Sequence, residues 1–263
     1  MRDQEPRLPI SYNDSTLDQL YGFVLNKPMR FLMDSVQVDF NKGEVMYVKD
    51  IIVLDLIRNN RWKRPIYYTT TTPAEARTKL DPYLVMQGMT FRLYPEKASS
   101  LAARDPSIAG TLDANIFVDI PRTDSLYRHV YKYDTFFRQD RMLEGEEAQT
   151  IIRTGNPLMF LSIAQAVKGN YAAAAETRLE MRKFWQYGGI LKPQLDFTIG
   201  GLLLEAGQAG RALQVFDSLS MEPKWYSELA QASIQKGNVE VTKSILHHII
   251  ERKPGYREGY AHL

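Results

Sequence analysis

Residues 47–72 read YVKDIIVLDLIRNNRWKRPIYYTTTT, and this stretch decides the fold of the N-terminal half of the chain. Between Lys49 and Asn60 the apolar residues cover most of a helical circumference, which predicts a helix buried on most sides. Its β-branched residues leave a strand open as the alternative. Pro65 keeps the residue before it out of the helical region, and the six residues that follow have the composition of a strand. The stretch therefore predicts one helix–turn–strand unit whose faces need cover from both sides.

The flanking segments predict the elements that supply this cover. Residues 36–40 alternate between apolar and polar side chains, which favours a half-buried strand, and residues 45–48 would return as its hairpin partner after a turn at 41–44. The further elements that we expect are a short helix over 16–25, a helical piece from residue 73, a helix over 83–87 between Pro82 and Gly88, a strand over 89–94, a surface loop over 97–110 and a last strand over 115–120. Strands and helices thus alternate in one αβ layer, followed by an aromatic-rich joint over 121–137.

The composition bounds the class of protein. A length of 263 residues allows one large or two ordinary domains, and 44% hydrophobic residues are enough for a buried core. A net charge of +2 gives no electrostatic case for nucleic acid as a partner, and the lack of cysteine excludes disulfides and cysteine chemistry. The most apolar window, residues 51–57, contains Asp55 and is far shorter than the roughly 20 residues of a membrane span. The chain as given is therefore expected to be soluble.

The C-terminal half repeats one short pattern. Its three copies are KGNYAAA from Lys168, EAGQAGRA from Glu205 and KGNVEVT from Lys236. Each copy has a glycine, and five positions later there is alanine in two copies and threonine in the third; these pairs are Gly169 with Ala174, Gly207 with Ala212 and Gly237 with Thr242. The pattern resembles the turn of the tetratricopeptide repeat, and this resemblance implies two or three divergent helical hairpins.

No pattern in the chain assigns a catalytic, cofactor-binding or metal-binding residue. Asp50 and Asp55 lie about 140° apart around their helix, so they do not converge on one substrate, and Asp50 is better placed to support the helix N-terminus. Gly200 and Gly201 favour close helix packing over a phosphate loop, because no strand precedes them. The histidines have no metal-ligand spacing and are interpreted as surface or packing residues: His129, His247, His248 and His262.

The basic corner between the predicted helix and the predicted strand is the first place to look for a ligand. Arg61, Lys63 and Arg64 can bind a phosphate or a carboxylate group. The alternative is a solvated turn with Trp62 packed beneath it.

Two residues on neighbouring strands extend this candidate site. Arg92 alternates away from Phe91 on its strand and is expected to pair with Asp55 or Asp81. The complete set of candidate ligand or partner contacts is Arg61, Lys63, Arg64, Tyr67 and Arg92.

Two motifs of the N-terminal half resemble a pair found in a family of large bacterial membrane proteins. They are DIIxxDxIxxNxWKRPIYY from Asp50 and YLxxxGMxxRLxP from Tyr83, and the likeness extends by motif and order over residues 36–137. The family is that of the protein O-mannosyltransferase-like proteins, in which a membrane-spanning GT-C type glycosyltransferase region precedes a soluble extracytoplasmic region and tetratricopeptide-like helices. Three features depart from the family pattern: Tyr68 stands where Phe is usual, Phe91 stands where Tyr is usual, and the four Thr residues of 69–72 replace a small apolar run.

This resemblance implies a soluble C-terminal part of such a protein, at the extracytoplasmic (periplasmic) face of the inner membrane. The catalytic acids of the GT-C type belong to the membrane region, which these 263 residues do not contain, so no catalytic residue is carried over. The parent protein is implied to be a glycosyltransferase that uses a lipid-linked sugar. The implied partners are its membrane domain, in the same chain or a separate one, and an acceptor polypeptide or partner protein, with no cofactor.

We therefore expect an α+β/α architecture, with an αβ layered domain over 1–137 and an all-α tetratricopeptide-like helical-hairpin domain over 138–263. The expected function is that of a non-catalytic accessory region that engages acceptor protein or a partner. One alternative is a free-standing tetratricopeptide adaptor for protein–protein interaction. Another is a small independent αβ enzyme with Arg64, Tyr67 and Arg92 around a pocket. The sequence leaves the sugar, the acceptor, the oligomeric state and the completeness of the chain open.

Overall fold

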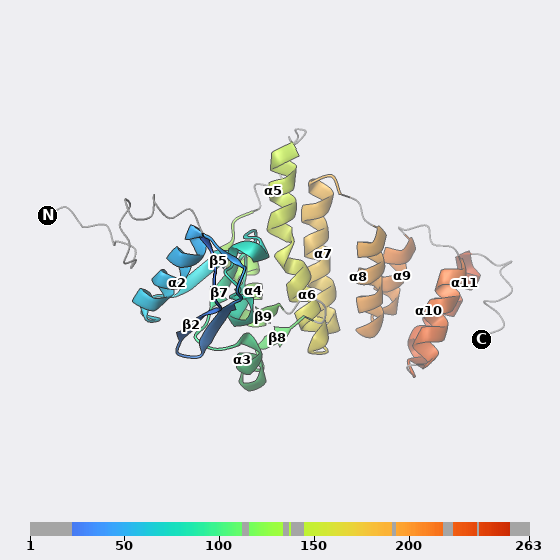
Figure 1. Ribbon diagram of the computed structural model, residues 1–263. Helices are drawn as coiled ribbons and strands as arrows, with labels where there is room; N and C mark the ends of the chain where they lie inside the picture. Colours follow the sequence, from blue (N-terminus) through green and yellow to red (C-terminus); the bar gives the residue numbers. More distant parts are fainter. Residues whose placement is uncertain are drawn as a thin grey trace. The chain divides into compact units, whose positions relative to one another are not determined.

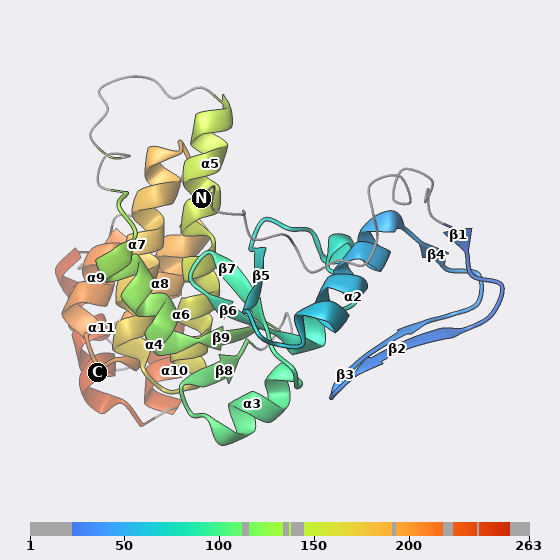
Figure 2. The same ribbon diagram turned by 90° about the vertical axis from the view of Figure 1, so that its left-hand side faces the viewer.

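The computed structural model of the protein describes residues 23–111, 116–133, 137, 145–190, 193–217, 223–235 and 237–252. The chain divides into two compact units, Met1–Tyr131 and Lys132–Leu263, where the sequence predicted domains of 1–137 and 138–263. The first unit is built around β-strands and the second is built from helices, as Figures 1 and 2 show. This order of a small sheet region followed by a helical region confirms the predicted fold class.

The first unit combines one large sheet with two small ones. Its described strands are β1 (Phe23–Val24), β2 (Met29–Met33), β3 (Val36–Phe40), β4 (Val45–Met46), β5 (Ile66–Thr69), β6 (Leu84–Gln87), β7 (Thr90–Leu93), β8 (Ile108–Gly110) and β9 (Phe117–Asp119). Its described helices are α2 (Val48–Asn60), α3 (Ala98–Arg104) and α4 (Ile120–Ser125), with the 3₁₀ turns η1 (Ala74–Ala76) and η2 (Asp81–Tyr83) and the π-helical turn η3 (Leu126–Val130). The large sheet has the order β5-β7-β6-β9-β8, in which β6 and β9 are parallel and the other pairs are antiparallel (Figure 2).

Helix α2 and strand β5 confirm the helix–turn–strand unit of the opening stretch. Leu54 and Ile57 are buried in the core, and the other apolar side chains of the helix are half-buried. Arg61 ends the helix with a φ of 47°, and its N–H group donates to the carbonyl of Ile57 at 3.2 Å. The left-handed conformation closes the helix and releases the chain towards β5.

The prediction of a helix over 83–87 is wrong, because strand β6 occupies this segment. The strand lies between β7 and β9, and all four of its residues are buried. A strand covered on both faces has a continuous apolar sequence without alternation, so its period does not distinguish it from a short helix. Gly88, expected to end that helix, takes a φ of 64° in the two-residue loop to β7. Strand β7 itself confirms the strand predicted over 89–94.

Four further segments of the first unit differ from the predicted elements. Strand β3 confirms the alternation over 36–40, but its partner is the preceding β2, and β4 pairs with β1 instead. The segment 97–110, expected as a loop, contains α3 and β8, and the helical piece from residue 73 is the short turn η1. Of the helix predicted over 16–25, Phe23–Val24 form β1, and residues 16–22 lie outside the described residues. The last strand, predicted over 115–120, is confirmed by β9.

The second unit is a series of paired helices. Its described helices are α5 (Gly145–Gly155), α6 (Pro157–Val167), α7 (Tyr171–Tyr187), α8 (Pro193–Glu205), α9 (Ala209–Asp217), α10 (Pro223–Gln235) and α11 (Val239–Arg252). Helix α6 packs against α7, α8 against α9, and α10 against α11, and α7 also packs against α8. Over the described parts of both units, no helix is long and apolar enough to cross a membrane.

The three hairpin joints of this unit have the same geometry. The glycine of each joint has a positive φ: 76° at Gly169, 73° at Gly207 and 77° at Gly237. In each joint the glycine N–H donates to the carbonyl three residues back at 2.9 Å, and the next N–H donates to the carbonyl five residues back at 2.8 to 2.9 Å. This is the Schellman helix ending. The residue five positions after each glycine is buried between the paired helices: Ala174, Ala212 and Thr242.

Candidate functional site

The basic corner is held by the turn of the β2–β3 hairpin. Trp62 donates from Nε1 to Oδ2 of Asp34 at 2.6 Å, and both residues have a positive φ, 58° and 51°. Asn60 is buried and donates from Nδ2 to the carbonyl oxygen of Arg64 at 2.6 Å. The indole and amide hydrogen bonds therefore fix the path of the corner, while the side chains of Arg61, Lys63 and Arg64 are exposed to solvent.

Tyr67 and Arg92 are brought together by the register of the sheet. They lie directly opposite each other on β5 and β7. Three positions further along the ladder, the N–H of Thr70 donates to the carbonyl of Met89 at 3.0 Å. Hydrogen-bonded and non-hydrogen-bonded pairs alternate along an antiparallel ladder, so Tyr67 and Arg92 form a non-hydrogen-bonded pair, whose side chains lie closer. In the described part of the chain, no hydrogen bond joins either residue to the cations of the corner.

A polar row continues from this pair across the same face of the sheet. The guanidinium of Arg92 lies over the ring of Tyr94, 4.9 Å from its centroid. Gln87 donates from Nε2 to the Tyr94 hydroxyl at 3.2 Å and to Oδ2 of Asp119 at 3.0 Å. Burial raises the pKa of Tyr94, so its hydroxyl stays protonated at neutral pH. We call Tyr67, Arg92, Tyr94, Gln87 and Asp119 the polar row.

Sequence reasoning found two members of the polar row and missed three. Asp119 also caps α4, because its Oδ1 accepts the N–H of Arg122 at 3.1 Å. Side chains alternate between the two faces of a strand, which places Gln87, Arg92 and Tyr94 on one face. The sequence shows this only to a reader who already knows the strand register and knows that β6 is a strand. The expected pairing of Arg92 with Asp81 is not formed, because Asp81 binds Arg77 at 2.7 Å.

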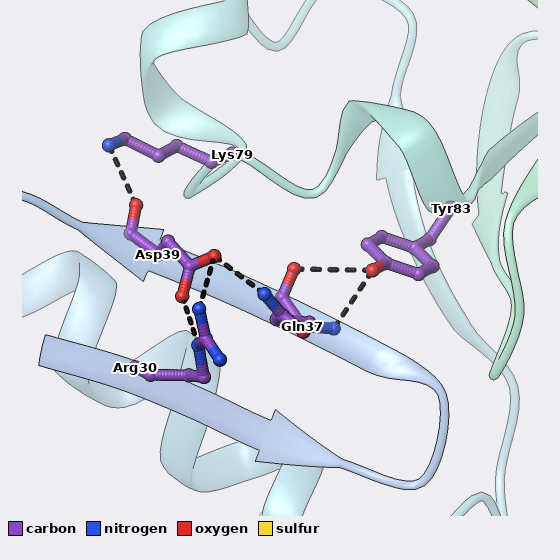
Figure 3. Close-up of polar contacts among 5 residues, drawn as sticks. All are labelled: Arg30, Gln37, Asp39, Lys79 and Tyr83. Atoms are coloured by element: carbon purple, nitrogen blue, oxygen red, sulfur yellow. Dashed lines mark hydrogen bonds and ion pairs between the residues drawn. The ribbon is translucent and has the colours of Figure 1, made fainter.

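A second polar cluster docks the β2–β3 hairpin onto η2 and the loop before it (Figure 3). The hydroxyl of the buried Tyr83 accepts the N–H of Gln37 at 2.8 Å and donates to the carbonyl of the same residue at 3.2 Å. Lys79 donates from Nζ to the carbonyl of Asp39 at 3.0 Å. Arg30 pairs with the Asp39 carboxylate at 2.6 Å and, with Gln37, holds the pKa of that carboxyl below its usual value. These contacts cover the outer edge of β3, which removes an exposed strand edge.

Asp50 has the helix-supporting role that the sequence predicted. Its buried carboxylate accepts the backbone N–H of Tyr47 at 3.0 Å, at the start of α2. It also accepts the Thr78 hydroxyl at 3.0 Å and the Lys49 ammonium at 2.7 Å. With these partners, the carboxylate of Asp50 serves the fold.

Of the glycines and histidines singled out in the sequence, Gly200 and His248 have structural roles, whereas a Cβ atom at Gly201 would meet nothing within 4 Å. Gly200 lies against the ring of Phe216, where a Cβ atom would overlap the aromatic carbons, so the predicted close helix packing is confirmed there. His248 contacts the carboxylate of Asp217 through Nε2 at 2.7 Å. Among the described residues, no group of three or more potential ligands is arranged to hold a metal ion.

Comparison with known proteins gives a match that covers part of the first unit. Residues 7–114 match the family model of TMEM260-associated domain 2. The matched span contains the basic corner, the hairpin dock and all of the polar row except Asp119, and it ends before the helical unit. Neither the curated proteins nor the solved structures yield a match.

Proposed function

We propose that the chain is a non-catalytic accessory region of a membrane-bound, TMEM260-like protein glycosyltransferase of the O-mannosyltransferase-like kind. The observation that carries the proposal is the match of residues 7–114 to TMEM260-associated domain 2. The motif pair from Asp50 and Tyr83 lies within that span and agrees with it. The membrane domain, in the same chain or a separate one, supplies the lipid-linked sugar chemistry, and this region works at its extracytoplasmic side.

The non-catalytic assignment rests on what the carboxylates of the first unit already do. Asp50 supports the start of α2, Asp119 caps α4, and Asp39 pairs with Arg30 in the hairpin dock. Each of these three carboxylates is engaged by donors that belong to the fold. A general base instead needs a carboxylate within reach of a substrate proton.

The open edge of β5 is where we place the acceptor polypeptide or partner protein. Strand β5 ends the sheet order, and the ladder geometry directs the backbone N–H and C=O groups of Tyr67 away from β7. An extended polypeptide can add to such an edge as a further strand. Tyr67 is 47% exposed and lies opposite Arg92, so its side chain is available to the added segment.

Site-specific photo-crosslinking in the intact chain tests this placement. A benzophenone amino acid replaces Tyr67 in one variant and Phe197, equally exposed at 44%, in the other. Membranes containing the chain are irradiated, and the adducts are identified by mass spectrometry. The proposal expects adducts of position 67 with a multi-spanning glycosyltransferase or its acceptor polypeptide. Sugar transfer from a lipid-linked donor by the purified chain alone contradicts the proposal.

Two substitutions at position 67 distinguish binding through the backbone edge of β5 from binding through the Tyr67 side chain. Tyr67→Pro removes the outward N–H group and is tolerated by an edge strand, whereas Tyr67→Val keeps that group and the preference for a strand. With the crosslinker moved to Thr69 on the same strand, Tyr67→Pro is expected to abolish the adduct and Tyr67→Val to retain it. Equal adducts from both variants exclude strand addition.

The second candidate is a free-standing tetratricopeptide-like adaptor. The three identical hairpin joints at Gly169, Gly207 and Gly237 favour it, and all of them lie outside the matched span. In the crosslinking experiment, this function predicts adducts of position 197 with a water-soluble protein and none of position 67 with a glycosyltransferase.

A further inference from the structure

A pocket of 590 Å³ lies in the first unit, apart from the polar row and the hairpin dock. It is lined by the segment from η1 to η2, strands β6 and β7, the start of α3 and the start of β9. The residues that decide its chemistry are Arg77, Asp81, Leu84, Phe91, Ser99 and Phe117. Its volume falls in the range of sites that enclose a small molecule.

Arg77 forms a fixed wall of this pocket. Its Nε and Nη2 donate to the carbonyl of Thr72 at 3.0 and 2.7 Å, and its Nη1 donates to Asp81 at 2.7 Å. The guanidinium lies over the ring of Phe91, 4.6 Å from the centroid, and the side chain is only 13% exposed. A guanidinium has five N–H groups, so one on each terminal nitrogen stays available to a ligand.

Asp81 supplies acceptors beside these donors. Arg77 occupies its Oδ1, and 43% of the Asp81 side chain is exposed at the pocket rim. The charges of the pair cancel, so an anion entering the pocket meets the carboxylate and a cation meets the guanidinium. The site thus favours a neutral ligand that carries hydroxyl donors and oxygen acceptors close together.

The rest of the lining selects the shape of that ligand. Phe117 presents an aromatic ring, the buried Leu84 and Phe91 add apolar surface beside Arg77, and the exposed Ser99 adds a hydroxyl. Aromatic faces pack against C–H surface, while the Arg–Asp pair binds hydroxyl groups at its edge. We propose that this pocket binds a neutral sugar ring. The proposal deepens the proposed function by naming its ligand class, and it rests on that function only for the origin of the sugar.

Titration of the full-length, isotope-labelled chain by NMR tests the proposal. The probes are methyl α-mannopyranoside and methyl β-glucopyranoside, with inorganic phosphate and cyclohexanol as the anionic and apolar comparisons. We expect a sugar to shift the amide signals of Phe91 and Ser99 saturably, with a dissociation constant on the order of 1 mM. Failure of both sugars to shift these signals well above that concentration overturns the proposal.

Matched variants show whether the binding belongs to this pocket. Ala74→Phe fills the pocket from an exposed position and is expected to abolish the shifts, whereas Ala103→Phe, at an exposed position on α3, leaves them unchanged. Asp81→Asn is expected to weaken sugar binding roughly tenfold through the loss of a charged acceptor. Its control is Asp124→Asn, in the equivalent i,i+4 pair with Arg128 at 2.8 Å.

Two outcomes contradict the assigned ligand class. Tighter phosphate binding that Asp81→Asn strengthens shows an anion site, and cyclohexanol binding that Asp81→Asn leaves unchanged shows an apolar site. The titration requires neither the membrane enzyme nor an acceptor. Its result is therefore independent of the crosslinking result that decides the proposed function.

Discussion

At the scale of single residues, Tyr68 has a buried polar group that the described residues around it do not satisfy. Its hydroxyl is buried on β5 and has no hydrogen-bond partner among the described residues. The motif that resembles the O-mannosyltransferase-like family usually has Phe at this position. A buried hydroxyl without a partner loses its hydration without compensation, so Tyr68 is a source of instability.

We predict that Tyr68→Phe stabilises the chain by about 1 kcal/mol, because it removes the unpaired hydroxyl and keeps the ring. The matched control is Tyr83→Phe, which removes a hydroxyl that bonds both backbone groups of Gln37 and should destabilise by about 1.5 kcal/mol. Urea unfolding of the two variants measures both changes. Destabilisation by Tyr68→Phe would show that the hydroxyl has a partner outside the described residues.

The same residue predicts an alkaline loss of stability. Burial, with the carboxylates of Asp81 and Asp50 nearby, raises the pKa of Tyr68 above its ordinary value of 10.0. The unfolded state releases this proton first, so stability is complete below pH 10 and falls as the pH rises towards the folded pKa. Urea unfolding at increasing pH should show a shallower alkaline decline for Tyr68→Phe than for the wild type. Identical slopes would exclude this residue as the cause.

Asp50 is a buried group with hydrogen-bond partners, so we expect its removal to destabilise the chain. Asp50→Ala leaves the N–H of Tyr47 and the hydroxyl of Thr78 without their acceptor, and should destabilise by about 3 kcal/mol. Lys49→Ala removes only a half-exposed partner and should cost less than about 1 kcal/mol. Chemical denaturation compares the two. Equal losses would mean that the ion pair, and not the helix start, gives Asp50 its importance.

At the scale of elements, adjacent glycines on α8 have opposite predicted effects. A Cβ at Gly200 overlaps the ring of Phe216, and Gly200→Ala should destabilise by about 2 kcal/mol. A Cβ at Gly201 meets open space, and Gly201→Ala should stabilise the helix by about 0.5 kcal/mol. Denaturation followed by circular dichroism distinguishes the two signs. A neutral Gly200→Ala would contradict the close approach of α8 and α9.

Elements with a clear period were predictable from the sequence. The helix of 49–60, the alternating strand of 36–40 and the strand of 89–94 follow from periodicity and turn residues. Strand β6 was missed because its four buried residues give no alternation, and β8 was missed because two of its residues, Ala109 and Gly110, have low strand propensity. The choice of β2 as the partner of β3 depends on tertiary packing, which alternation does not encode.

The candidate site was predictable only in part, for the same reason. Tyr67 and Arg92 were selected by residue type, and the register makes them neighbours. Gln87 and Asp119 join them through β6 and β9, whose parallel pairing bridges distant parts of the sequence. No local pattern indicates such a pair.

At the scale of the whole molecule, the two compact units are predicted to unfold separately. Asp50→Ala should increase hydrogen exchange within residues 23–131 only, and Gly200→Ala within residues 132–252 only. Hydrogen-exchange mass spectrometry of the intact variants measures this directly, because local unfolding exposes the amides of one cooperative unit. Increased exchange in both units from either substitution would show one cooperative structure.

The central claim is that this region assists sugar transfer without performing it. The most direct measurement is the transfer of labelled sugar from a lipid-linked donor to an acceptor protein by membranes containing the glycosyltransferase, with and without the purified chain. We predict that the chain alone transfers nothing, that membranes lacking it transfer poorly, and that adding it restores transfer, but not when it carries Tyr67→Pro. Transfer by the chain alone, or undiminished transfer without it, would contradict the account.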